Sequence, residues 1–265
     1  MSSLPASAAR QALVRPASIK RVSPDLLLAL AAAIFVVAAL YSSVGHAGAS
    51  GYIAVMSLFA LAPASIKPTA LVLNILVASL ATWQFARAGH LSLRRVWPFA
   101  VLSVPAAFVG GYITLPLATF KFLLGAVLLY SALHLLLAKA NQRDAVPTPL
   151  WLALGAGGLI GLLSGLTGTG GGIFLSPLLL MMGWAGTKET AATSALFILL
   201  NSVAGLLGNF ASTALLPSFI WPLLACAAVG GFIGSRLGSS QASAIVIRRL
   251  LAAVLLIAGG KLMLT

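Results

Sequence analysis

Long apolar runs separated by short polar stretches are the main pattern of this chain. The long runs cover residues 26–44, 71–85, 96–117, 122–137, 150–163, 191–207, 219–237 and 250–264. Two shorter apolar runs cover residues 52–61 and 173–182. About 20 apolar residues form a helix that crosses ~30 Å of hydrocarbon. The pattern therefore predicts an all-α polytopic membrane protein.

The two short runs follow stretches rich in glycine, residues 45–51 and 165–172. Glycine destabilises a helix interior by about 1 kcal/mol per residue, so we expect an apolar helix to break at 165–172 and restart near Ile173. Lipid cannot satisfy the N–H groups of such a break, and a helix N-terminus favours an anion. The alternative is that these glycines let helices pack closely.

The two halves of the chain share motifs in the same order. Gly45, Gly48 and Gly51 lie 120 residues before Gly165, Gly168 and Gly171. Four further pairs recur at offsets of 120 to 127: Trp97-Pro98 and Trp221-Pro222, Gly110-Gly111 and Gly230-Gly231, Lys67 and Lys188, and residues 126–129 and 253–256. Duplicated halves with paired helix breaks are typical of transporters that bind substrate near the midplane. We predict a basic tail (1–24), a first repeat (25–138), a polar linker (139–149) and a second repeat (150–265).

The short runs decide the predicted topology. A ten-residue helix is roughly 15 Å long, so each short run is predicted to be a re-entrant half-helix beside about four spans per half. With a cytoplasmic N-terminus, this arrangement places ten of the sixteen lysines and arginines inside. Five crossings per half would place only seven inside, so the positive-inside rule favours four. Five crossings with inverted halves remain the alternative.

Composition supports a membrane protein and narrows the chemistry. Of 265 residues, 60% are hydrophobic and 7% are charged, against about 25% charged residues in soluble domains. The net charge of +13 comes from basic residues at segment ends, which indicates topology rather than nucleic-acid binding. The single cysteine, Cys226, excludes an internal disulfide and a cysteine metal cluster. We predict no metal site and no cofactor.

Three motifs of the second half resemble the sulfite exporter TauE/SafE family: Gly168-Thr169-Gly170-Gly171-Gly172, Ser176-Pro177-Leu178 and Ala191-Ala192-Thr193-Ser194-Ala195. The resemblance covers about residues 26–264. It implies an inner-membrane carrier of sulfite, organosulfonates or other small anions. The first half departs from the motif, with Met56-Ser57 in place of Ser-Pro and Leu73-Asn74 near the Thr-Ser position.

The candidate substrate site combines both glycine-rich stretches with the polar residues that follow them. Its predicted residues are Gly48, Ser50, Gly51, Asn74, Gly168, Thr169, Gly170, Gly171, Gly172, Thr193 and Ser194. His46 is a candidate to pair with the anion or to carry a proton, or else to bond a carbonyl of the broken helix. The acids Asp25, Asp144 and Glu189 lie at segment edges or in links. We therefore predict outward anion flux driven by the membrane potential, with any proton coupling dependent on His46.

Two other classes compete with this interpretation. Gly48-Ala49-Ser50-Gly51 resembles the Gly-x-Ser-Gly motif of rhomboid proteases, which would make Ser50 the nucleophile of an intramembrane serine hydrolase. Such an enzyme needs a membrane-embedded histidine, and His134 lacks the expected small-residue spacing. The third class is a helical membrane subunit without its own transport. We favour a transporter, not an enzyme, with a small anion and the bilayer as partners; a homo-oligomer stays open.

Overall fold

A computed structural model describes residues 23–113, 146–210 and 216–240, with isolated positions between 116 and 136 and between 252 and 263. Every regular element in these residues is an α-helix, which confirms the predicted all-α class. Residues 1–22 of the predicted tail, residues 139–145 of the predicted linker and His134 lie outside the described residues.

The first part of the chain forms α2 (Pro24–Ser43), α3 (Ala49–Leu58), α4 (Pro63–Arg87) and α5 (Leu93–Tyr112). Local sequence fixes the helix ends. The Ser23 hydroxyl accepts the Leu26 N–H at 3.4 Å, and Pro24 occupies the first turn of α2. After α2 ends, Gly45 adopts a φ of 79°, a conformation that glycine reaches without strain.

The second part forms α7 (Leu150–Thr167), α8 (Gly172–Met181), α9 (Thr187–Gly208) and α10 (Ile220–Ser240). The helix that we expected to break between residues 165 and 172 ends at Thr167 and resumes at Gly172. The two short apolar runs become α3 and α8, each ten residues long.

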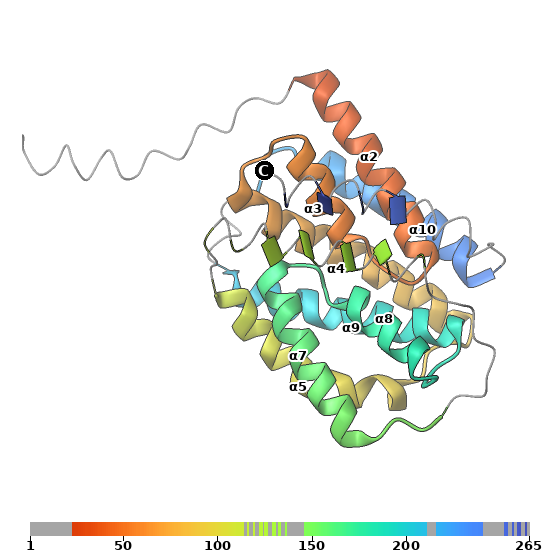
Figure 1. The fold of residues 1–265 in the computed structure, drawn as a ribbon. Helices are drawn as coiled ribbons and strands as arrows, with labels where there is room; N and C mark the ends of the chain where they lie inside the picture. The colour runs from red at the N-terminus through yellow and green to blue at the C-terminus, as the bar shows by residue number, and fades with distance from the viewer. Residues whose placement is uncertain are drawn as a thin grey trace, which may run out of the picture.

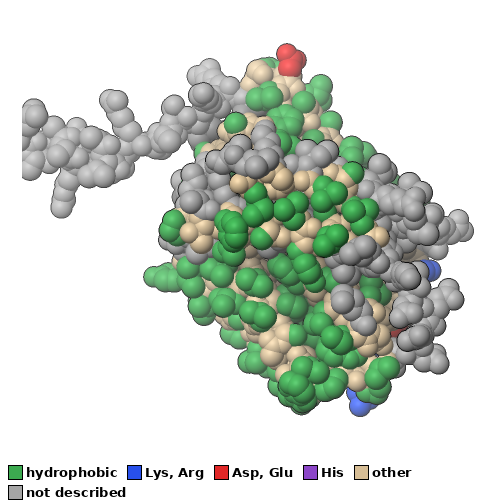
Figure 2. Space-filling view, viewed as in Figure 1, with side chains coloured by type: hydrophobic (Ala, Val, Ile, Leu, Met, Phe, Trp, Pro, Cys, Tyr) green, Lys and Arg blue, Asp and Glu red, His purple; other side chains and the backbone are tan. Residues whose placement is uncertain are grey.

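Five of the described helices are long and apolar enough to cross a membrane: α2, α4, α7, α9 and α10. Their outer faces carry many exposed apolar side chains, among them Leu28, Leu159 and Leu207. Figure 2 shows such side chains covering much of one face of the molecule. A surface of this kind suits lipid, so the protein is a multi-pass membrane protein.

The helices pack in pairs through small residues. Figure 1 shows α2 beside α10 and α5 beside α7, with α4 and α9 between these pairs. A side chain added at Gly165 would collide with Ala107 O of α5, and one added at Gly234 would collide with Ala39 O of α2. These two glycines therefore serve close helix packing. This is the alternative role considered above for the glycine-rich stretches, and it applies to Gly165.

Side-chain contacts define two ends of the bundle. At the first, which we call the Glu189 end, Arg95 at the start of α5 lies 3.1 Å from Glu189 at the start of α9. At the opposite, Lys67 end, Lys67 near the start of α4 donates to Gly111 O near the end of α5 at 3.4 Å. The Lys67 stem also lies against Gly168 at the end of α7.

These contacts correct one detail of the predicted topology. Four spans per half would place Arg95 and Glu189 on opposite sides of the membrane, but they form an ion pair. Since α7 ends at the Lys67 end and α9 starts at the Glu189 end, residues 168–186 carry the chain across the bundle. The prediction that this segment returns to the side from which it enters was wrong, because it considered only the ~15 Å length of the ten-residue helix. Four residues of unwound chain before α8 add up to about 13 Å.

The same crossing occurs in the first part of the chain. A side chain at Gly45, just after α2, would collide with Ala191 in the second turn of α9, so α2 ends towards the Glu189 end. Because α4 starts at the Lys67 end, residues 44–62 cross the bundle in the direction opposite to residues 168–186. The helices α2 and α7, which begin the two parts, run in opposite directions.

Candidate functional site

Two interruptions of helical structure meet inside the bundle. The first break, residues 44–48, separates α2 from α3; the second break, residues 168–171, separates α7 from α8. His46 of the first break lies with its Nε2 atom 3.1 Å from Gly172 O, at the start of α8. The two breaks, which are more than 120 residues apart in the chain, therefore contact each other.

Glycines set the backbone of the second break. Gly168, Gly170 and Gly171 have φ angles of 74°, 77° and 79°, in the left-handed region that other residues rarely adopt. Space is restricted as well. A side chain added at Gly170 would collide with Asn74 Nδ2, and one added at Gly172 would collide with Ile198. Glycine is thus required here by conformation and by contact.

The second break exposes a row of unpaired N–H groups to the interior. Residues 169–173 are buried, and none of their N–H groups is hydrogen-bonded to the described part of the protein. A buried N–H without a partner costs about 1–3 kcal/mol. Successive N–H groups in left-handed and turn conformations form a concave anion-binding surface, and the helix dipole of α8 adds positive potential. The second break can therefore bind an anion.

Side chains brace the first break. The Ala49 N–H donates to Asn74 Oδ1 at 3.1 Å, and the Tyr52 hydroxyl donates to Ala47 O at 2.6 Å. The Ser50 hydroxyl donates to the Tyr41 hydroxyl at 3.0 Å. Each of these side chains is almost fully buried. The first break thus has an internal partner for the Ala49 N–H, whereas the N–H groups of Ala47, Gly48, Ser50 and Gly51 have no hydrogen-bond partner among the described residues.

Asn74 of α4 connects the two breaks. Its Oδ1 atom caps the N-terminus of α3, and its Nδ2 atom donates to Ser202 Oγ of α9 at 2.8 Å. The same amide lies against Gly170. The hydrogen-bond partners of Asn74 were not predicted, although a fully buried amide within a membrane span needs partners on other helices.

His46 starts a chain of polar contacts into the second part of the protein. A carbonyl can only accept, so the contact with Gly172 O requires the proton on Nε2. Ser176 Oγ lies 3.0 Å from the same nitrogen and 2.7 Å from Ser194 Oγ. One of the alternatives for His46, a hydrogen bond to a carbonyl of the broken helix, is therefore present.

The remaining predicted residues fall into distinct environments. Gly48 adopts a φ of 107° and faces the Tyr52 ring, whereas Gly51 packs on Val37 and Tyr41 of α2. Thr169 Oγ1 lies 2.9 Å from Thr167 Oγ1. Thr193 is fully buried, and its hydroxyl has no hydrogen-bond partner among the described residues.

Sequence reasoning missed several polar residues of the site. Ser176, Ser202 and Tyr41 bond to predicted site residues but were not selected. Ser176 was visible in the Ser-Pro motif. Ser164 and Asn201 each have one buried oxygen without a partner in the described part, and Ser164 lies against Gly171.

Nothing in the described site favours catalysis or a metal. Ser50 bonds to a tyrosine rather than to a histidine. Among the described residues, no group of three or more His, Cys, Asp or Glu side chains could hold a metal ion.

The bundle of apolar helices with paired internal breaks defines the protein as a membrane transporter, and comparison with known proteins agrees. The sulfite exporter TauE/SafE family model matches residues 30–262, so the chain belongs to this family. The probable membrane transporter protein y4hK of Sinorhizobium fredii (strain NBRC 101917 / NGR234) is 44% identical over 242 residues, 89% of this chain and 98% of that protein. The probable membrane transporter protein ORF9 of Sinorhizobium sp is 28% identical over 230 residues, 83% of this chain and 86% of that protein. No solved structure matches.

Proposed function

We propose that this transporter carries a small anion and binds it at the second break. The observation that carries the proposal is the row of buried N–H groups over residues 169–173, which have no hydrogen-bond partner within the described part of the chain. These groups need acceptors, and an oxyanion offers several at once. The protein acts as a carrier and not as a hydrolase, because its Ser50 hydroxyl has no activating base in the described site.

Charge around the break supports an anionic substrate. Lys67 is partly buried, and its stem lies against Gly168. The described acids are Asp25, exposed at the start of α2, and Glu189, paired with Arg95 at the far end. No described carboxylate therefore repels an anion at the break. The family name makes sulfite the substrate to test first, with an organosulfonate next as a related small anion.

We further propose that the chain is a duplication with inverted halves, residues 25–138 and 150–265, joined by the linker 139–149. The opposite directions of α2 and α7 support this, as does the matching order of long, short, long and long helices. The site would then lie near the midplane between the repeats, where inverted-repeat carriers bind substrate. Rocking of one repeat against the other would open the site to each side in turn.

Inversion changes the expected orientation in the inner membrane. With five passages per half, a cytoplasmic N-terminus leaves seven of the sixteen lysines and arginines inside and nine outside. The positive-inside rule then favours the Glu189 end in the cytoplasm and the N-terminus outside. The test is Ala88→Cys, in the α4–α5 loop, with Cys226→Ser. An impermeant thiol reagent should label it in inverted vesicles only, and labelling in intact cells would contradict this orientation.

The energy source follows from the charges. Anion efflux from a negative cell interior gains ~2.3 kcal/mol per charge per 100 mV, about a 50-fold gradient. No described carboxylate lies at the breaks, so His46 is the remaining candidate for a proton relay. We propose outward flux driven by the potential.

The experiment is transport in proteoliposomes against sulfite, an organosulfonate, sulfate and chloride. We expect saturable, potential-driven flux of at least one oxyanion. The absence of flux for every anion, with flux of a neutral or cationic solute instead, would overturn the proposal.

A further inference from the structure

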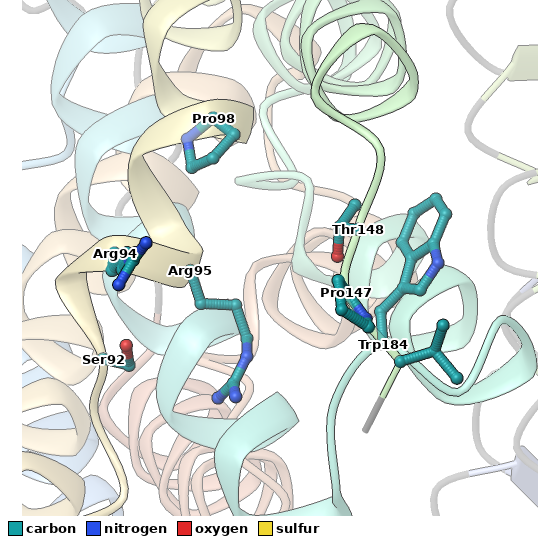
Figure 3. Close-up of a pocket in the computed structure, with 8 residues that line it drawn as sticks. Ser92, Arg94, Arg95, Pro98, Pro147, Thr148 and Trp184 are labelled. Carbon is teal, nitrogen blue, oxygen red and sulfur yellow. The ribbon is translucent and has the colours of Figure 1, made fainter. Parts of the chain in front are cut away.

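A pocket of about 250 Å³ opens at the Glu189 end, away from both breaks. The start of α5 contributes Ser92, Arg94, Arg95 and Pro98; the segment before α7 contributes Val146, Pro147 and Thr148; and Trp184 follows α8. Figure 3 shows Arg95 extending from α5 into the space between these segments, with Thr148 and Trp184 across from it. The pocket shares no residue with the proposed substrate site, and the family name assigns it no role.

Among the described residues, the pocket carries more positive than negative charge. Arg94 and Arg95 lie in the first turn of α5, which contains no acid, and the Ser92 side chain does not cap this helix. Arginines at a helix N-terminus add to the positive end of the helix dipole. The nearby carboxylate, Glu189, lies 3.1 Å from Arg95 Nη1 without alignment for a hydrogen bond, and it also accepts the Gly186 N–H at 3.2 Å. In the described part of the chain, the carboxylate paired with Arg95 is thus shared with the Gly186 N–H, while Arg94 and the N-terminus of α5 add further positive charge beside it.

Exposed tryptophans place the pocket at headgroup depth. Trp83 near the end of α4, Trp97 at the start of α5 and Trp151 at the start of α7 are 50%, 48% and 72% exposed. All three lie at the Glu189 end, and the Arg87 guanidinium lies 5.0 Å from the centre of the Trp83 ring. Tryptophan gathers where hydrocarbon meets the polar headgroups, so this level of the bundle marks one membrane interface.

Charge is distributed unequally between the two ends. Apart from Lys67, the lysines and arginines of the described residues lie at the Glu189 end: Arg87, Arg94, Arg95, Lys188 and Arg236. Below the pocket, the outer face of α5 is apolar, with Trp97 and Val101 half exposed. The polar head of a ligand bound here would contact the arginines, and its apolar part would contact the apolar outer face of α5.

We propose that this pocket binds the headgroup of an acidic phospholipid, with its phosphate at Arg94 and Arg95 and its acyl chains along α5. Basic pockets between helices at the membrane surface bind such headgroups. The bound phosphate supplies the negative charge that Glu189 alone does not provide. Because Trp184 follows α8, the lipid also contacts the segment that leads away from the second break.

The test uses the purified full-length protein in a neutral detergent. Bound lipid is measured by native mass spectrometry with phosphatidylglycerol, with phosphatidylcholine, and with soluble glycerol 3-phosphate. We expect phosphatidylglycerol to bind more tightly than phosphatidylcholine. Each arginine near an acidic membrane surface contributes about a five-fold change in affinity, so R94Q/R95Q should weaken phosphatidylglycerol binding about 25-fold.

The matched control is R87Q/R236Q, which removes the same charge at the same end but outside the pocket. We expect it to weaken binding far less than R94Q/R95Q does.

Arg94 is exposed, so R94Q alone should fold normally and should weaken binding about five-fold. Equal losses in the two pairs, or equal binding of both lipids, would overturn the proposal. Competition by glycerol 3-phosphate at the same concentration as the lipid would assign the pocket to a soluble anion instead. Transport is not the readout, so none of these results bears on the proposed carrier function.

Discussion

The two breaks hold corresponding places in the chain but differ in how their backbone groups are satisfied. In the first break, Asn74 caps the N-terminus of α3 and Tyr52 bonds Ala47 O. In the second break, the N–H groups of residues 169–173 have no partner in the described protein. The glycines differ in the same sense, with three consecutive glycines at 170–172 against isolated ones at 45, 48 and 51.

This difference suggests different roles for the two breaks, which the sequence analysis had assigned together to the substrate site. Asn74 and Tyr52 hold the first break from within, but the N–H groups of Ala47, Gly48, Ser50 and Gly51 also have no partner in the described protein. The second break has five such donors and two consecutive left-handed glycines, and open donors gain free energy when an acceptor arrives. We interpret the first break as a brace and the second as the anion cradle. His46 and Asn74 join them, so movement of one repeat would be transmitted to the cradle.

The largest expected effect comes from closing the cradle. Gly170→Leu forces a side chain onto Asn74 and into a φ of 77°. Displacement of the cradle by about 1 Å can cost ~100-fold in rate, so we expect transport in proteoliposomes to fall about that far. The control is Gly155→Leu on α7, where an added side chain meets open space. Full activity of Gly170→Leu would remove the second break from the site.

A smaller effect is expected from cutting the connection between the breaks. Asn74→Ala leaves the Ala49 N–H and the Ser202 hydroxyl without their partner and should destabilise the protein by about 1–3 kcal/mol. Transport should fall about ten-fold. Gln84→Ala is the matched control, because Gln84 is also a buried amide of α4 and donates to Phe232 O at 3.0 Å, away from the breaks. Equal transport losses in the two variants would show that stability alone explains them.

His46→Ala tests whether the contact between the breaks also carries protons. We expect efflux at clamped potential to fall only about three-fold, although the variant loses the contacts with Gly172 O and Ser176 Oγ, because a hydrogen bond of this kind contributes roughly 0.5–1.5 kcal/mol. Efflux should not follow an imposed pH gradient in this variant. Flux that follows the pH gradient at zero potential and persists in His46→Ala would contradict the proposed energy source.

The smallest effect should come from the brace. Ser50→Ala removes one hydrogen bond to Tyr41, so we expect a stability loss of about 0.5–1.5 kcal/mol and nearly unchanged transport. Tyr41→Phe should have a similar effect, and the double variant should lose little more. A fluorophosphonate probe should leave Ser50 unlabelled, and labelling would revive the hydrolase alternative.

Within the described residues, the apolar pattern was enough to predict the helices and the position of the second break, because glycine and membrane hydrophobicity act locally; the predicted spans 122–137 and 250–264 lie mostly outside those residues. Helix direction was not predictable in this way. It depends on whether a half-helix plus its unwound residues crosses the bundle, and the pair Arg95–Glu189 revealed this only in three dimensions. For the same reason Asn74 was predicted to face the site, but its bonds to Ala49 and Ser202 join segments far apart in the chain.

The most direct test of the anion cradle is a structure of the protein with selenite, the heavier analogue of sulfite, located by the anomalous signal of selenium. The account predicts a peak at the second break, with oxygens about 2.7–3.2 Å from the N–H nitrogens of residues 170–172. Gly170→Leu should abolish this peak, and Gly155→Leu should retain it. A selenium peak confined to the Arg94–Arg95 pocket, or located at the first break alone, would contradict the central claim.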